Sequence, residues 1–319
     1  MDAQSFRRFR DLAAKAQPVE AIRALANRCA NGAGTADERL DLAAALTHAA
    51  FAAPERLTRT YDAAAQGWRG AEVRGSAIAF ADHAPAPIAE ALWIEVAAIL
   101  DVNTAPVTAG DVTTRTAALG AFLDEGLAPR FAATAAAYPG VAEAAANGPP
   151  SFFTLAALAA CPKGSLGRTF HDLIVDNNFD LEVLDRDELG LSQLPAPLDY
   201  LNARILQCHD LWHIVAGYRT TALHEVAISG FQAAQFGHGY SAIFLAVTAA
   251  RTAAEPALFS LIMDVTLDAW RHGRETPALV GVDWPGVWAG TIEEVRARLG
   301  VEPFASSHAA DLFEQLKAA

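Results

Sequence analysis

The chain has 319 residues, of which 52% are hydrophobic and 19% are charged, and its formal net charge is −13. This composition supplies one large or two modest hydrophobic cores, since a domain usually has about 100–200 residues, and it excludes a largely disordered or low-complexity protein. The negative charge argues against nucleic acid as a partner, because phosphate backbones are negative as well.

Helical signals run along the whole chain, and no stretch has the alternating β-branched pattern of a strand. Alanine-rich segments alternate with breaks of Pro, Gly, Asp and Thr. We therefore predict an all-α fold, a multi-helix bundle in which short connections favour antiparallel neighbours. The predicted helices are 4–16, 18–30, 37–53, 54–66, 87–100, 110–124, 128–138, 151–160, 165–177, 198–216, 221–236, 240–253, 256–272, 286–298 and 308–318.

A domain boundary is predicted at Asn103 to Gly110, where Pro, Thr and Gly cluster between two helical patterns. Residues 1–105 would form an N-terminal helical region of unknown role. Residues 106–319 would form a second helical domain, which contains the candidate site described below. The division leaves open whether the two parts share a core.

The N-terminus and the longest apolar runs argue against secretion and against a membrane span. Residues 1–17 lack an uninterrupted apolar stretch and carry acids that a transit peptide avoids. The apolar runs, such as Phe152 to Cys161, are shorter than the ~18 residues of a membrane span. The three cysteines are not spaced as metal-binding pairs, which fits a reducing compartment. We expect a cytoplasmic protein, or one bound peripherally to the inner membrane.

The most informative segment is HDLWH at 209–213, which is followed by Glu225. Histidines four residues apart lie one turn above each other on a helix, where both imidazoles can bind one metal ion. Asp210 lies further round the same flank of that helix. We predict a metal site with His209, Asp210, His213 and Glu225 as ligands. The alternative is a pair of core histidines with ordinary hydrogen bonds.

Glu225 can join these ligands only if the chain reverses direction after His213. On one continuous helix the two residues would be roughly 18 Å apart along the axis. Gly217 is a natural C-terminal cap, and Thr220 or Thr221 is a natural N-cap for a second helix. We therefore predict a metal site between two helices joined by a tight turn. The alternative for Glu225 is a first-turn acid that interacts with the helix N-terminus.

These residues resemble the hallmark of the fourth coenzyme-Q assembly protein (COQ-four) family, which is His-Asp-x-x-His, eleven residues and then Glu. Here the pattern is HDLWH, IVAGYRTTALH and Glu225. Residues 164–170 (GSLGRTF) look like the family's Gly-x-Leu-Gly segment, and residues 268–301 look like its closing Trp-x-x-x-Gly-Arg, Trp and Arg-x-x-Leu-Gly pattern. The similarity covers about residues 150–301, so 106–319 is the predicted COQ-four-like domain.

The chain departs from the family pattern next to the predicted site. Gln207 stands where the family usually has Glu, and Gly230-Phe231-Gln232 replaces an expected Lys/Trp/Glu cluster. Residues 1 to about 100 show no clear correspondence to the family. The family's choice of substrate therefore does not transfer directly to this chain.

The resemblance implies a role in ubiquinone biosynthesis, on the ring of a polyprenylated hydroxybenzoate. The implied reaction is a metal-dependent decarboxylation of a 4-hydroxy-3-polyprenylbenzoate-type substrate, which is oxidative if the same carbon is also hydroxylated. Two imidazoles with one or two carboxylates suit Zn²⁺ first and Fe²⁺ second. Asp210 is the expected catalytic residue, because a carboxyl group beside the ion can deliver the proton to the ring.

The resemblance also implies an alternative without catalysis, a prenyl-lipid-binding scaffold that organises the quinone-synthesis enzyme complex. The expected partners are a prenylated aromatic substrate or isoprenoid lipid, other quinone-biosynthesis enzymes, and a second copy of the chain. The apolar predicted helices 151–160 and 240–253 are ordinary core, or the walls that a prenyl tail needs.

Two further sets of histidines are secondary candidates. His171-Asp172 is a second His-Asp doublet, as in metal-dependent phosphohydrolases of the HD type. His224 and His238 lie close in sequence to the predicted ligands and can support them through hydrogen bonds. Because His238 stands between two glycines, we expect it to be exposed to solvent.

A third candidate is one helix face formed by Asp264, Asp268 and His272, which recur every four residues. Three such residues can in principle bind a metal ion. We expect instead that the face is solvated or ion-paired with a nearby arginine of the same helix, Arg271 or Arg274.

Overall fold

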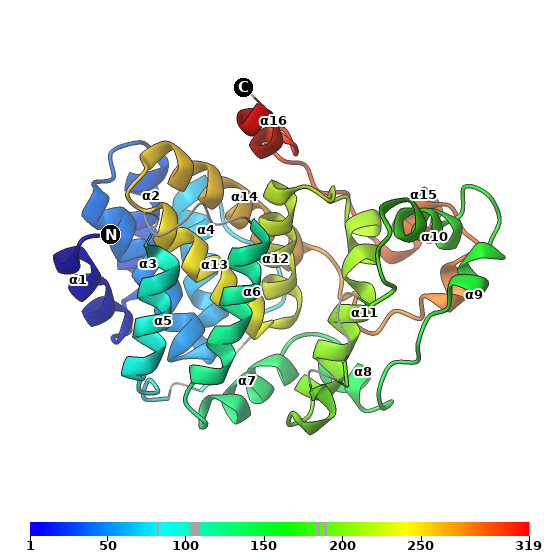
Figure 1. Ribbon diagram of the computed structural model, residues 1–319, viewed down its shortest axis with the longest axis horizontal. Coiled ribbons are helices and arrows are strands. Elements are labelled where there is room, and N and C mark those ends of the chain that lie inside the picture. Colours follow the sequence, from blue (N-terminus) through cyan, green and yellow to red (C-terminus); the bar gives the residue numbers. More distant parts are fainter. Residues whose placement is uncertain (79, 82, 102–108, 183–185, 188–189, 319) are drawn as a thin grey trace.

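The computed structural model describes residues 1–78, 80–81, 83–101, 109–182, 186–187 and 190–318. Within these residues the regular elements are helices and no strand is present, which confirms the predicted all-α fold (Figure 1). None of the helices in this part of the chain is both long enough and apolar enough to cross a bilayer.

The α-helices follow one another along the chain with short 3-10 helices between some of them. The first eight are α1 (Ala3–Ala13), α2 (Val19–Ala30), α3 (Ala36–Phe51), α4 (Leu57–Arg69), α5 (Glu90–Leu100), α6 (Ala109–Ala118), α7 (Leu127–Ala136) and α8 (Val141–Ala145). The others are α9 (Leu155–Ala159), α10 (Leu166–Asn177), α11 (Leu198–Ala216), α12 (Ala222–Phe236), α13 (Gly239–Thr252), α14 (Pro256–Glu275), α15 (Ile292–Leu299) and α16 (Leu312–Ala318). The 3-10 helices are η1 (Pro54–Arg56), η2 (Leu119–Phe122), η3 (Leu191–Gln193) and η4 (Pro285–Val287).

Local caps explain where observed helices differ from predicted ones. The predicted helix 151–160 is shortened to α9, because the Thr154 side chain accepts a hydrogen bond from the Ala157 N–H and starts the helix there. The predicted helix 286–298 begins later as α15, where Thr291 and Glu294 form a capping box. The short helix α8 was not predicted. The boundary predicted at 103–110 falls mainly on residues outside the described ones, so it stays a prediction.

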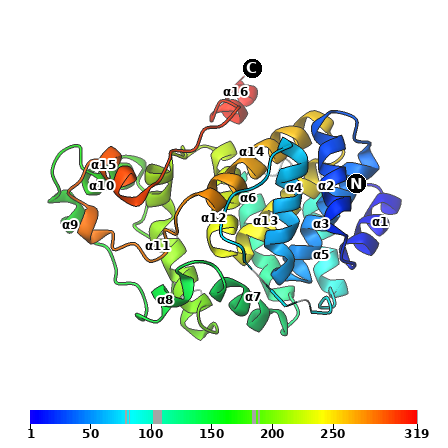
Figure 2. The same ribbon diagram turned by 180° about the vertical axis from the view of Figure 1, so that it is seen from behind.

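Helices α3, α4 and α5 pack against α13 and α14, and α1 and α2 pack in turn on α3 and α4 (Figures 1 and 2). Their apolar side chains join those of α13 and α14 in one core, which we call the N-terminal core. Tyr61 of α4 stacks on Trp270 of α14 with ring centroids 4.7 Å apart, and both rings are fully buried. The N-terminal helices therefore share a core with elements of the C-terminal half.

A second core lies on the other side of α12 and contains side chains from α10, α11 and the segment before α15. It includes Phe170, Trp212, Trp284 and Trp288. The two cores meet at α12, which contributes Ala233 to the N-terminal core and Phe236 to the second one. This arrangement buries α12 on several sides.

Candidate metal centre

The chain reverses direction between α11 and α12, as the sequence predicts. Helix α11 ends at Gly217, which has a left-handed conformation with φ of 82°. The Gly217 and Tyr218 N–H groups both donate to the His213 carbonyl, at 3.1 and 2.8 Å. Thr221 is the N-cap of α12, but its hydroxyl donates to the Ala310 carbonyl rather than accepting from α12. The turn brings Glu225 back towards the histidines.

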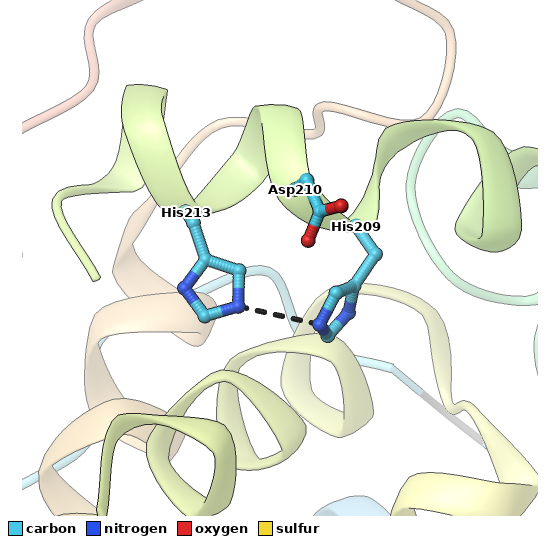
Figure 3. Close-up of side chains that lie close together, drawn as sticks. All are labelled: His209, Asp210 and His213. Carbon is cyan, nitrogen blue, oxygen red and sulfur yellow. Dashed lines mark hydrogen bonds between the residues drawn. The ribbon is translucent and has the colours of Figure 1, made fainter. Parts of the chain in front are cut away.

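The structure brings three of the predicted ligands into direct contact. His209 Nε2 lies 3.2 Å from His213 Nε2 (Figure 3). The Glu225 carboxylate spans the two rings, with Oε2 at 3.3 Å from His209 Nε2 and Oε1 at 3.3 Å from His213 Nε2. Asp210 projects from the same side of α11, and ligand atoms of Asp210 and the two histidines lie within 4.8 Å of one another (Figure 3).

The spacing of these donor atoms fits a divalent cation. In a tetrahedral site with ligand distances of about 2.0–2.1 Å, neighbouring donors are about 3.3 Å apart, which matches the separations of 3.2 and 3.3 Å. Two imidazole nitrogens that face each other so closely repel if both carry lone pairs. A cation or a proton between His209 and His213 removes that repulsion.

Without a metal, the charges at the site are set by burial and by the ion pair. Burial lowers the pKa of His209, but the hydrogen bond and charge of Glu225 outweigh it and leave that pKa raised. Burial raises the pKa of Glu225, but both imidazoles outweigh it and hold that pKa well below its usual range. For Asp210 burial prevails over the imidazoles, so its pKa is raised. Glu225 is therefore the permanent anion of the site.

His238 is buried, with 7% of its surface exposed, so the expectation that it is exposed was wrong. Its flanking glycines mark close packing: a Cβ at Gly237 would be 2.5 Å from a ring carbon of Tyr138, and one at Gly239 would be 2.9 Å from Phe131. The His238 Nδ1 atom lies 2.8 Å from the Ser241 hydroxyl. Its expected support of the ligands is therefore indirect, through Ser241.

Gln232 is a part of the site that sequence reasoning missed. Its amide nitrogen lies 2.9 Å from His209 Nδ1, on the side of the ring away from Glu225 and His213. Its amide oxygen is 3.3 Å from the Ser241 hydroxyl. Gln232 follows Glu225 by seven residues and therefore lies on the same face of α12, a spacing that could have revealed it.

His224 and Gln207 hold the surrounding backbone. His224 is buried, and its Nδ1 accepts a hydrogen bond of 2.9 Å from the Arg219 N–H, inside the turn. Gln207 accepts from the Arg204 guanidinium at 2.7 Å, and its amide donates to the Ser151 carbonyl. Gln207 is therefore tied to the segment before α9.

The remaining candidates are ion pairs. His171 Nδ1 lies 2.9 Å from Asp172, which also pairs with Arg168 at 2.8 Å. Within the part of the chain that the structure describes, this doublet belongs to no cluster of three metal-ligating groups. A cation already occupies its anionic side, which argues against a second metal centre there.

The partner expected for Asp264 and Asp268 was wrong. Both carboxylates pair with Arg69 of α4, at 2.7 and 2.6 Å, because α4 packs across α14. The arginines of α14 pair elsewhere: Arg271 with Glu275 and Arg274 with Asp62. His272 of the same face bonds to the Tyr218 hydroxyl and the Glu302 carbonyl.

Comparison with known proteins supports the resemblance seen in the sequence. Residues 150–305 match the family model "Coenzyme Q (ubiquinone) biosynthesis protein Coq4". The "Ubiquinone biosynthesis protein COQ4 homolog, mitochondrial" of Danio rerio is 27% identical over 158 residues, 48% of this chain and 55% of that protein. Its namesake in Drosophila ananassae is 30% identical over 149 residues, 45% of this chain and 53% of that protein. The chain thus spans about half the length of these relatives.

A solved structure from Nostoc punctiforme is similar with a TM-score of 0.49 and 23% sequence identity. The similarity covers 66% of this chain and 97% of that one.

Proposed function

We propose that this chain, whose residues 150–305 match the Coq4 family model, acts in ubiquinone biosynthesis as a metal-dependent decarboxylase of a polyprenylated hydroxybenzoate. The observation that carries the proposal is the meeting of His209, His213 and Glu225 from two helices, with donor separations of 3.2–3.3 Å. This donor set suits Zn²⁺, and Fe²⁺ is the second choice.

The residues of the site have separate tasks in the proposed reaction. His209, His213 and Glu225 would hold the ion, and Asp210 lies beside them on α11. The bound cation supplies Lewis-acid stabilisation of the substrate's carboxylate and phenolate oxygens. The bond between ring and carboxyl carbon breaks, CO₂ leaves, and the ring carbon takes a proton from Asp210. Burial, which raises the pKa of Asp210, favours the protonated form that this role requires.

An oxidative course, in which the same ring carbon gains a hydroxyl group, is the variant of this proposal that needs O₂ and a redox-active ion such as Fe²⁺. The two courses differ in their products and in their need for oxygen. Carrying out the reaction with and without O₂ therefore separates them.

One structural feature favours the alternative function, a prenyl-lipid-binding scaffold for other quinone-biosynthesis enzymes. Phe152, Leu155, Val175 and Phe179 are exposed large apolar side chains, and all four lie around α9 and α10 in the family-matched segment. Helices α9 and α10 pack against each other, and a contiguous exposed apolar patch is typical of surfaces that bind a partner or a lipid. In this alternative the metal ion would stabilise the turn between α11 and α12.

The first experiment measures the metal content of the protein prepared without chelator or added metal. We expect one divalent ion per chain in the parental protein and none in His209→Ala or Glu225→Gln. The matched control is His171→Ala, because His171 also lies beside an aspartate on a helix but belongs to no such cluster among the described residues. A parental protein without an ion, or variants that keep it, would contradict the metal site.

The second experiment separates enzyme from scaffold with a 4-hydroxy-3-polyprenylbenzoate-type substrate. CO₂ release by the metal-loaded parental protein, lost in Glu225→Gln, supports the decarboxylase. Retention of an isoprenoid lipid through purification, with no substrate consumed in the presence of metal and O₂, supports the scaffold instead.

A further inference from the structure

Three buried side chains form a hydrogen-bonded chain behind His209. Gln232 of α12 contacts His209 Nδ1 at 2.9 Å, Ser241 of α13 contacts the Gln232 amide at 3.3 Å, and His238 contacts Ser241 at 2.8 Å. Gln232, Ser241 and His238 are all buried. This hydrogen-bonded series is therefore shielded from water. Inside the protein each of its polar groups depends on its neighbour for a hydrogen bond.

His213 has no comparable support. Its Nδ1 atom is buried without a hydrogen-bond partner among the described residues. Of the two imidazoles, only His209 therefore has a hydrogen-bond partner among the described residues at its second ring nitrogen, Nδ1. In metal sites such a partner determines which ring nitrogen keeps its proton and which is free to bind the ion.

The donors and acceptors of this hydrogen-bonded series can be ordered in either of two directions. In the first, the Gln232 amide N–H donates to His209 Nδ1, Ser241 donates to the Gln232 oxygen, and His238 Nδ1–H donates to Ser241. His209 then carries its proton on Nε2 and cannot bind a metal ion through that atom. This direction corresponds to the observed placement of the amide nitrogen next to Nδ1.

In the second direction every bond is reversed. The Gln232 oxygen accepts from His209 Nδ1–H, its amide N–H donates to Ser241, and the Ser241 hydroxyl donates to His238 Nδ1. The two ends of the amide have nearly the same shape, so a rotation of the Gln232 side chain end by half a turn exchanges them in the same space. The Nε2 lone pair of His209 is then free to face the ion.

The second direction needs His238 to be neutral, because a doubly protonated ring could not accept from Ser241. Burial, together with the nearby His209, lowers the pKa of His238 to about 3. The imidazole thus stays neutral at ordinary pH and can accept or donate through Nδ1. Each of the three hydrogen bonds therefore has one donor and one acceptor in both directions.

We propose that Gln232 is a positioning residue that selects the metal-binding tautomer of His209, with Ser241 and His238 holding its amide in the required orientation. This inference rests on the metal site proposed above. It assigns a role to Gln232, at a position where the chain departs from the family pattern, and it links the N-terminus of α13 to the site.

The test compares the Zn²⁺ affinity of Gln232 variants with that of the parental protein. Gln232→Leu removes the acceptor for Nδ1–H, so we expect the affinity to fall by about 10–100-fold. Gln232→Glu restores an acceptor of similar size, so its affinity should stay within a few-fold of the parental value. Ser241→Ala removes only the group that orients the amide, and we expect a smaller loss, about 10-fold or less.

A spectroscopic readout tests tautomer selection directly. In ¹⁵N-histidine NMR spectra of the Zn²⁺-loaded parental protein, His209 should show Nε2 bound to the metal and an Nδ1–H protected from exchange with water. The protected Nδ1–H should be lost in Gln232→Leu and present in Gln232→Glu. A purely structural role of Gln232 would not restore this signal in the charged variant.

The matched control is Gln235→Leu, which removes a second buried glutamine of α12. Gln235 donates to the Gly273 and Thr276 carbonyls, away from the site. We expect this variant to lose stability but to keep the parental Zn²⁺ affinity. If the parental protein binds no ion, the proposed metal site itself fails. If it binds one and Gln232→Leu binds it equally tightly, only the role of Gln232 is overturned.

Discussion

The candidate centre places four ionisable side chains of different charge within a few ångströms, so each residue's role depends on its neighbours. Glu225 contacts both imidazoles and is held in its charged form by them. Asp210 lies on the same flank of α11, but burial favours its neutral form. A permanent anion suits a metal ligand and a protonated carboxyl suits a proton donor. The two carboxylates therefore have different expected functions.

Substitution of Asp210 separates these functions. We expect Asp210→Asn to keep its metal ion but to release CO₂ about 10²–10⁴-fold more slowly, the usual effect of losing a general acid. Metal analysis and the rate of CO₂ release measure the two properties on one sample. Asp199→Asn, on the first turn of the same helix, is the control and should change neither. Loss of the ion in Asp210→Asn would instead make Asp210 a ligand.

The buried neutral His238 makes stability depend on pH. The unfolded chain binds a proton at His238 below pH 6.5, whereas the folded protein does so only near its lowered pKa of about 3. Falling pH therefore favours unfolding in this window, by up to about 1.4 kcal/mol per pH unit for one such group. The charged or titratable neighbours are His209, which contributes to the lowered pKa, and Tyr240, whose ring lies 5.9 Å away.

This dependence is measured by denaturant unfolding of metal-free protein between pH 5 and pH 6.5. We expect the free energy of unfolding to decrease more steeply with falling pH in the parental protein than in His238→Asn. His48, His224 and His272 also have lowered pKa values and are present in both proteins, so the difference isolates His238. Equal slopes would show that His238 does not stay neutral on folding.

The turn between α11 and α12 decides whether Glu225 can reach the histidines. Gly217 is needed there for two reasons. Its φ of 82° is unfavourable for any residue with a side chain, and a Cβ would lie 2.9 Å from Pro303 Cβ and 3.0 Å from the Phe304 nitrogen. The C-terminal segment is held at this point, because the Phe304 N–H donates to the Ala216 carbonyl at 2.8 Å. The turn is thus fixed by its own backbone and by a distant part of the chain.

Gly217→Ala should therefore lower the free energy of unfolding by more than the same substitution does at an otherwise similar helix cap. We expect about 1–3 kcal/mol of destabilisation from strain and crowding together. Gly70, which caps α4 with φ of 68° and has no heavy atom within 4 Å of a Cβ, is the matched control. Gly70→Ala should cost only about 1 kcal/mol. Equal losses, measured by denaturant unfolding, would show that contact with the C-terminal segment adds nothing.

At the scale of the whole molecule, the N-terminal helices complete the core on which α12 depends. Tyr61 and Trp68 of α4 pack on Trp270 and Phe259 of α14. Arg69 of the same helix pairs with two carboxylates of α14. Helix α14 in turn packs along α12, which contains Glu225 and Gln232. A region without clear correspondence to the family thus supports the candidate site from behind.

A fragment of residues 106–319 tests this dependence. Removing the N-terminal helices would expose the apolar faces of α13 and α14, so we expect the fragment to lack a cooperative unfolding transition and a native near-ultraviolet circular dichroism spectrum. The full chain is the control and should show both. A fragment that unfolds cooperatively and binds the metal ion would establish 106–319 as an independent domain.

The sequence alone determined features that depend on residues close together in the chain. Helical spacing and caps predicted α11, Gly217 and α12, and the HDLWH segment with Glu225 identified the donors that the turn brings together. These predictions succeed because a helix places residues four apart on one side and a left-handed glycine ends it. The same segment carries the resemblance to the Coq4 family, whose model matches residues 150–305.

Only the tertiary structure decided which distant residues surround these donors. The contact of His209 with Gln232 joins α11 to α12, and the pairing of Arg69 with Asp264 and Asp268 joins α4 to α14. Neither these contacts nor the burial of His238 can be read from neighbouring residues in the sequence. The glycines beside His238 suggested an exposed loop, yet they allow aromatic rings to pack against the backbone. Periodicity in the sequence predicts which face of a helix is apolar. Which other element covers that face depends on how all the helices pack together.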